Sequence, residues 1–146
     1  MTIKPATRMY LYTALVVLWM LNGMSCSRSN QNSAVQTVEH WLALLDTGKY
    51  TESWNGLSEL YKQNDTVEKW VDHFDKYHKP LGKLLERKLI DQTTTSLTEA
   101  PEGEYIIFQY QSAFENKKNV SEAVSVVKDM DGQWRILGYF IDVSQQ

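Results

Sequence analysis

Cys26, the only cysteine of this 146-residue chain, follows an apolar run over residues 9–21 that is itself preceded by Lys4 and Arg8. A positively charged start, a short apolar run and small residues before the cut are the layout of an export signal. A transmembrane helix needs about 20 apolar residues, more than this run supplies. The sequence therefore predicts a signal peptide over residues 1–25 and acylation of the Cys26 thiol. An ordinary cleaved signal peptide without lipid is the alternative.

The residues around Cys26 resemble the lipobox of bacterial lipoproteins, in which a small residue such as Ser25 directly precedes the modified cysteine. Gly23 stands where the lipobox usually has leucine. The resemblance implies a palmitate-bearing lipoprotein, anchored in a membrane of the bacterial cell envelope and facing the periplasm. Ser27, in place of an aspartate, favours sorting to an outer membrane. A soluble periplasmic protein is the alternative.

An arginine and a glutamate on expected strands form a second set of residues with chemical potential. Glu122 alternates in phase with valines, so its carboxylate is buried if that face of the strand is buried. A buried charge costs several kcal/mol unless it is paired and hydrogen-bonded. Arg87, in phase with Leu85 and Leu89, is the expected partner, and Tyr110 could donate a further hydrogen bond. The pair predicts either the polar floor of a small ligand pocket or, as the favoured interpretation, a structural ion pair that fixes strand register.

The sequence offers little for metal, cofactor or nucleophilic chemistry. His73 and His78 lie five residues apart on an expected helix, which leaves their side chains about 140° apart, whereas helical metal ligands favour a spacing of four. Neither a Gly-x-Ser-x-Gly elbow nor a phosphate-binding glycine loop occurs. We therefore expect no metal, no cofactor and no catalytic residue. The alternative is an isomerase or dehydratase that uses a carboxylate such as Asp46 or Glu122 as base.

The charge of the chain argues against nucleic acid as a partner. The formal net charge is −3, and removal of residues 1–25 takes away Lys4 and Arg8 and shifts it to −5. Nucleic-acid binding proteins instead carry clustered basic residues. The expected partners are the membrane, through the lipid anchor, and an envelope protein or small ligand.

The first half of the chain after Cys26 shows helical spacing of apolar residues. Residues 26–32 are polar and predict a flexible tether, after which Ser33 begins a capping-box pattern. Helices are expected over residues 33–47, from Thr51 through Tyr61, and from a cap at Asp65 to Pro80. The stripe expected to be buried on the third helix comprises Val67, Trp70, Val71, Phe74 and Tyr77.

The second half alternates as strands do. Asp131 and Gly132 indicate a hairpin turn, and Gly138 indicates a bulge in the last strand. Strict alternation would place Phe140 on the face of Trp134 and turn Tyr139 to the opposite face. The expected strands cover residues 84–94, 105–114, 120–128 and 134–143.

Helices first and hairpin-linked strands afterwards predict an α+β domain over residues 33–146. Its expected architecture is three N-terminal helices packed on a curved, four-stranded antiparallel sheet of the cystatin-like or cone type. Neither an internal repeat nor a second linker divides this segment, which has the length of one domain.

Several short strings, in this order along the chain, resemble the bacterial family catalogued as domain of unknown function 4019. An arginine is usual in that family two residues before the Pro-Leu-Gly string, where this chain has His78. The family's exported members have no agreed activity, and its helix-then-sheet order is similar to the cone-shaped nuclear transport factor two-like domains. The strings are Leu45-Asp46-Thr47-Gly48-Lys49-Tyr50, Ser53-Trp54, Pro80-Leu81-Gly82 with Arg87, Pro101-Glu102-Gly103-Glu104-Tyr105, and Asp131-Gly132-Gln133-Trp134-Arg135 with Gly138-Tyr139-Phe140.

Together these features predict a noncatalytic lipoprotein domain of the cell envelope that binds a partner protein or a small ligand.

Overall fold

The computed structural model describes residues 25–95 and 103–143. The chain forms two compact units, Met1–Ser33 and Ala34–Gln146, and the second contains the whole sheet. The helical elements are α2 (Ser25–Asp46), α3 (Tyr50–Asn55), α4 (Glu59–Lys62), α5 (Val67–Tyr77) and the 3-10 turn η1 (Lys79–Leu81). The strands are β1 (Leu84–Thr95), β2 (Tyr105–Phe114), β3 (Val120–Lys128) and β4 (Trp134–Asp142).

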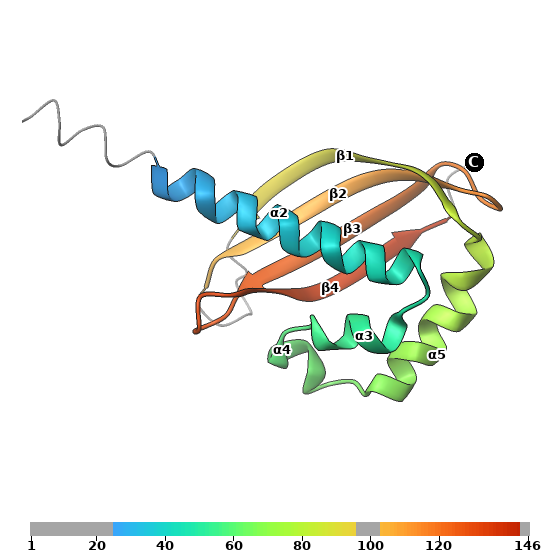
Figure 1. Ribbon diagram of the computed structural model, residues 1–146, viewed down its shortest axis with the longest axis horizontal. Helices are drawn as coiled ribbons and strands as arrows, with labels where there is room; N and C mark the ends of the chain where they lie inside the picture. The colour runs from blue at the N-terminus through green and yellow to red at the C-terminus, as the bar shows by residue number, and fades with distance from the viewer. Residues whose placement is uncertain (1–24, 96–102, 144–146) are drawn as a thin grey trace, which may run out of the picture. The chain divides into compact units, whose positions relative to one another are not determined.

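The four strands form one antiparallel sheet in the order β1-β2-β3-β4, so each strand pairs with its neighbour in sequence (Figure 1). This arrangement confirms the predicted α+β class with its four-stranded antiparallel sheet. The helical segments α3 and α4 lie next to β4 (Figure 1).

One face of the sheet and the helices share a hydrophobic core. Val38, Trp41 and Leu45 follow one another at helical spacing on α2 and are all buried. Trp70 and Phe74 do the same on α5. Full burial of such side chains contributes about 1.5–3 kcal/mol each. The sheet completes this core with Ile106, Phe108, Tyr110, Val124, Val126, Trp134 and Ile136.

The first helix begins at Ser25, eight residues before the predicted start at Ser33. Neither glycine nor proline interrupts the segment, and the Ser33 hydroxyl donates to the Asn30 carbonyl at 2.7 Å inside the helix rather than capping it. Residues 26–32 are therefore helical and not irregular; their role as a tether stays a prediction. The predicted signal peptide, residues 1–25, lies outside the described part of the chain except for Ser25, and so does the Cys26 side chain.

The second predicted helix is broken into α3 and α4, with the break at Gly56 to Ser58. These residues pair with the edge of β4, because Ser58 N–H donates to the Ile136 carbonyl at 2.8 Å and Ile136 N–H donates to the Gly56 carbonyl at 3.0 Å. A β-carbon on Gly56 would lie 3.0 Å from Trp41 Cδ1, so the close approach favours glycine. Pairing with the sheet thus outweighs helical propensity in this segment.

The cap of α5 is Thr66 and not the predicted Asp65. The Thr66 hydroxyl accepts from Lys69 N–H at 3.4 Å, while the Asp65 carboxylate accepts from Thr66 N–H at 2.8 Å. Tyr77, expected in the core, is 51% exposed and contacts the His73 ring.

Two irregularities in the sheet decide which side chains face the core. The β1–β2 register shifts between Leu84 and Glu86, which turns Leu85 outward and brings Arg87 to the inner face. The β3–β4 register shifts next to Gly138, which confirms the predicted bulge. Beyond that bulge the faces exchange, and strict alternation was wrong: Tyr139 turns inward and Phe140 is 66% exposed.

Candidate functional site

Five polar residues meet on the inner face of the sheet, and each comes from a different element. Arg87 on β1 lies opposite Ser112 on β2, and Glu122 follows on β3. The bulge in β4 adds Tyr139, and the last residue of α2 adds Asp46. We call these five residues the Arg87 cluster. The two register shifts bring the strand residues of this cluster together, because without them neither Arg87 nor Tyr139 would face inward.

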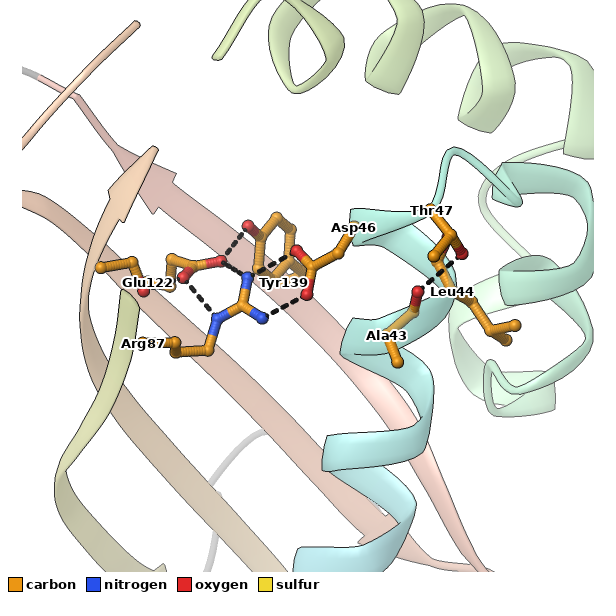
Figure 2. A network of polar contacts seen from close by, with 8 residues as sticks. Ala43, Leu44, Asp46, Thr47, Arg87, Glu122 and Tyr139 are labelled. Atoms are coloured by element: carbon orange, nitrogen blue, oxygen red, sulfur yellow. Dashed lines mark hydrogen bonds and ion pairs between the residues drawn. The ribbon is translucent and has the colours of Figure 1, made fainter. Parts of the chain in front are cut away.

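The guanidinium group of Arg87 lies between two carboxylates, and Figure 2 shows it bridging them. On one side it forms a bidentate pair with Asp46, with N–O distances of 2.6 and 2.9 Å. On the other side it donates to both oxygens of Glu122, at 2.8 and 3.0 Å. Paired N–H donors of this kind are among the strongest hydrogen bonds in proteins.

The carboxylate of Glu122 accepts four hydrogen bonds. Its Oε1 accepts from Arg87 and from the Tyr139 hydroxyl at 2.6 Å (Figure 2). Its Oε2 accepts from Arg87 and from the Ser112 hydroxyl. A carboxylate has about four acceptor positions, so this one is fully satisfied although its side chain is 0% exposed.

The electrostatics of the cluster keep its carboxylate charged. Burial, the largest single influence, raises the pKa of Glu122, but the hydrogen bonds from Arg87, Ser112 and Tyr139 and the positive charge of Arg87 outweigh it and lower the pKa. Burial likewise opposes the charge on Arg87, yet its bonds to Asp46 and Glu122 raise its pKa. Burial and the nearby Glu122 charge raise the pKa of Tyr139 well above its ordinary value, so its hydroxyl keeps its proton.

Residues 37–139 match the family model described as Protein of unknown function (DUF4019). The chain belongs to this family. The match confirms the resemblance seen in the sequence, and it contains all five members of the Arg87 cluster. No curated protein matches the chain. The likeness to cone-shaped nuclear transport factor two-like domains stays a prediction.

The structure of this DUF4019 chain brings together Arg87 and Glu122, the two residues that the sequence paired. It does not add Tyr110 to their hydrogen bonds: the donors to Glu122 within the described residues are Arg87, Ser112 and Tyr139. Tyr110 lies opposite Glu122 in the register and is buried, and burial, followed by the Glu39 charge, raises its pKa to about 12.

Sequence reasoning missed three members of the cluster as partners. Asp46 was considered only as a base in an enzyme, and nothing in the sequence links the end of the first helix to β1. Ser112 could have been found, because it alternates in phase with Tyr110 and Phe114 on an inward face. Tyr139 was missed because the bulge next to Gly138 exchanges the two faces of β4, and strict alternation had placed Tyr139 on the outer face.

A sixth titratable group, the imidazole of His78, lies beside the cluster. His78 is the C-terminal cap of α5 and is only 4% exposed, and the rings of Phe74, Phe114 and Tyr139 pack near it. In the described part of the chain its Nε2 atom has no hydrogen-bond partner. Burial lowers the pKa of His78, although Asp46 and Glu122 pull it upward. The ring is therefore held neutral.

A hollow of about 300 Å³ lies between α5 and β4. Exposed aromatic side chains border it, with Tyr77 51% and Phe140 66% exposed. Its inner wall includes Tyr139, which connects the hollow to the Arg87 cluster. The remaining lining residues are His73, Ile141 and Val143.

No group of three or more His, Cys, Asp or Glu side chains in residues 25–95 and 103–143 could hold a metal ion. Over the same ranges, no helix combines the length and apolar character needed to cross a bilayer.

Proposed function

We propose that this DUF4019 chain is a noncatalytic lipoprotein domain of the bacterial cell envelope that binds a partner protein or a small ligand. The observation that carries the proposal is the saturation of the Arg87 cluster, which contains Asp46 and Glu122, the two carboxylates considered above as catalytic bases. The anchor on Cys26 rests on the sequence, and the binding surface rests on the hollow between α5 and β4.

The bonding of the cluster favours a structural role. A general base works best when its pKa lies near the operating pH and its lone pair is free to take a proton. Glu122 has a lowered pKa, and its carboxylate oxygens already accept hydrogen bonds from Arg87, Ser112 and Tyr139. Asp46 is held by both terminal nitrogens of Arg87. The alternative, an isomerase or dehydratase with one of these carboxylates as base, would have to break the network before reaction.

The hollow between α5 and β4 supports the binding role. Its volume of about 300 Å³ falls at the lower end of the range for ligand pockets, about 300–1,000 Å³. Tyr77 and Phe140 offer rigid aromatic area at its rim, the side-chain type enriched where proteins bind partners.

Intact mass spectrometry of the mature protein from its native membrane tests the anchor. We expect a chain that begins at Cys26 and carries a mass increase of diacylglyceryl size, absent from a Cys26→Ser variant. An unmodified chain recovered from the soluble fraction would overturn the lipoprotein part of the proposal and leave the binding part standing.

Photocrosslinking in native cells tests the binding surface. A benzoylphenylalanine in place of Tyr77, at the rim of the hollow, should give one discrete adduct. The matched control places the same group at Met130, which is fully exposed on the β3–β4 hairpin and does not line the hollow. The same adducts from both positions, or none from Tyr77 together with no binding in a small-molecule screen, would contradict the proposed surface.

A further inference from the structure

The outer face of the sheet, opposite the core, carries an uncharged patch at its centre. The register places Gln109 of β2, Ala123 of β3 and Phe140 of β4 side by side on this face. An antiparallel sheet with one free face normally covers it with polar and charged residues. None of the six residues at its centre is charged, and we call this set the outer patch: Gln109, Gln111, Ser121, Ala123, Ser125 and Phe140.

The outer patch carries both a projection and a recess. Phe140 on β4 and Ile90 on β1 stand out from the sheet, 66% and 58% exposed. Between them lies a hollow of about 170 Å³ whose lining includes Ala123, the short side chain directly opposite Phe140. An apolar cavity of about 150 Å³ holds a benzene ring, so this recess has the size of one phenyl group.

The charges around the outer patch restrict what can cover it. The chain is acidic, with a formal charge of −3, and two copies repel each other where charged surfaces meet. On this face the charged residues Glu86, Lys88 and Asp91 stand on β1 at one margin of the sheet, and Asp142 stands on β4 at the other, opposite Ser121. The centre is neutral, so two copies can bring it together without opposing like charges.

We propose that a second copy of this chain docks on the outer patch, with Phe140 of each copy in the recess of the other. A two-fold interface requires a surface that is complementary to itself, and this patch holds the projection and the recess side by side. The axis passes near Ala123, and the two Phe140 rings lie next to each other across it. The inference does not rest on the proposed function, because it requires neither acylation of Cys26 nor a ligand in the hollow beside α5, although Phe140 also lines that hollow.

Cysteine crosslinking of the full chain in native cells, before any fractionation, tests this interface. Near a two-fold axis the same residue of both copies lies close together, so Ala123→Cys should give a covalent dimer with a short bis-maleimide. The matched control is Met130→Cys, which is fully exposed but lies on the hairpin outside the patch. The unaltered chain controls for crosslinks through Cys26. We expect the yield at position 123 to exceed the yield at position 130 by about tenfold.

A second substitution shows whether Phe140 holds the dimer together. Adding Phe140→Asp to Ala123→Cys places two like charges at the axis and should lower the yield to that of the control. Because Phe140 is 66% exposed, the variant should fold, and circular dichroism checks that it does. If the Phe140→Asp variant does not fold, Ile90→Asp takes its place in the experiment. Equal yields at positions 123 and 130, an unchanged yield with Phe140→Asp, or mass spectrometry that finds a different protein in the adduct would each overturn the proposal.

Discussion

At the scale of single residues, the energetics of this domain centre on Arg87. The positive charge of one guanidinium group balances the carboxylates of Asp46 and Glu122, and the Arg87 side chain is only 10% exposed. Attraction between buried charges roughly offsets the cost of taking them out of water, so such a network adds little net stability over apolar packing. Loss of one partner is a different matter, because the remaining charge stays buried without compensation.

Arg87→Met should therefore destabilise the domain strongly. Removal of one partner of a buried ion pair costs about 3–5 kcal/mol, and here it exposes two carboxylates to each other. Urea denaturation gives the free energy of unfolding. The control is Arg135→Met, since Arg135 pairs with Asp129 and Asp131 at the surface and surface pairs contribute little. Equal losses for the two variants would show that the Arg87 cluster is not energetically distinct.

His78 should make stability depend on pH. Its folded-state pKa is lowered, chiefly by burial, below the value near 6.5 of an unfolded chain. The contribution of His78 to the free energy of unfolding is fully present above the unfolded-state pKa. It is lost as the pH falls toward the lower folded-state pKa, because the unfolded chain binds the proton first. The charges of Asp46, Glu122 and Arg87 act on the ring, and the rings of Tyr50 and Tyr139 lie beside it. Glu122 also has a lowered pKa, but its own loss of stability lies at lower pH, below its unfolded value near 4.3.

The measurement is the free energy of unfolding in urea at pH 7 and pH 5. We expect His78→Phe to show a smaller decrease than the unaltered protein, because a phenyl ring packs among the same aromatic side chains and takes no proton. His73→Phe is the control, since His73 is exposed. An unchanged decrease in His78→Phe would mean that other groups cause the pH dependence.

At the scale of elements, the sequence predicted the sheet and the bulge at Gly138, but neither the irregularity in β1 nor the exchange of faces that the bulge in β4 causes. Strand order and bounds followed from alternating residues and turn signals, and the pairing of Arg87 with Glu122 followed from the cost of a buried charge. The bulges depend on how neighbouring strands fit, which one strand does not reveal. For that reason the sequence placed Tyr139 on the wrong face. Asp46 was missed for a different reason, because its contact with Arg87 depends on how α2 packs against the sheet.

The turn between α5 and β1 connects His78 to Arg87 and depends on Gly82. Its φ of 78° and ψ of −159° lie in a region that only glycine adopts readily. A β-carbon there would also lie 2.9 Å from Glu115 Oε2, whose carboxylate accepts from Lys83 N–H. Gly82→Ala should therefore cost at least about 1–3 kcal/mol by urea denaturation.

Gly132→Ala is the matched control for Gly82→Ala. Gly132 has nearly the same φ of 77°, but a β-carbon would meet nothing within 4 Å. The larger loss should belong to Gly82→Ala, because only that variant adds a steric conflict to the strained backbone. Equal losses would mean that backbone conformation alone decides, and that the contact with Glu115 relaxes without cost.

At the scale of the whole molecule, the long helix α2 packs on the core along only part of its length. After Ser33 its apolar side chains enter the core, with Val38, Trp41 and Leu45 all buried. Residues 31–33 are polar and exposed. An isolated helical segment of this length is marginal in water, and most helical stability comes from packing.

Hydrogen exchange should therefore divide α2 near Ala34. Amides of residues 30–33 are expected to exchange much faster than those of residues 38–45, because opening the first segment breaks no core contact of its side chains, whereas opening the second removes Trp41 and Leu45 from the core. Mass spectrometry of peptic fragments measures this, with the protected strand β3 as internal reference. A steep gradient of exchange rates along α2 would fit a helix whose N-terminal residues open easily and so form a flexible link between Cys26 and the domain. Uniform protection along α2 would contradict it, and would mean that residues before Ala34 are stabilised by contacts of their own.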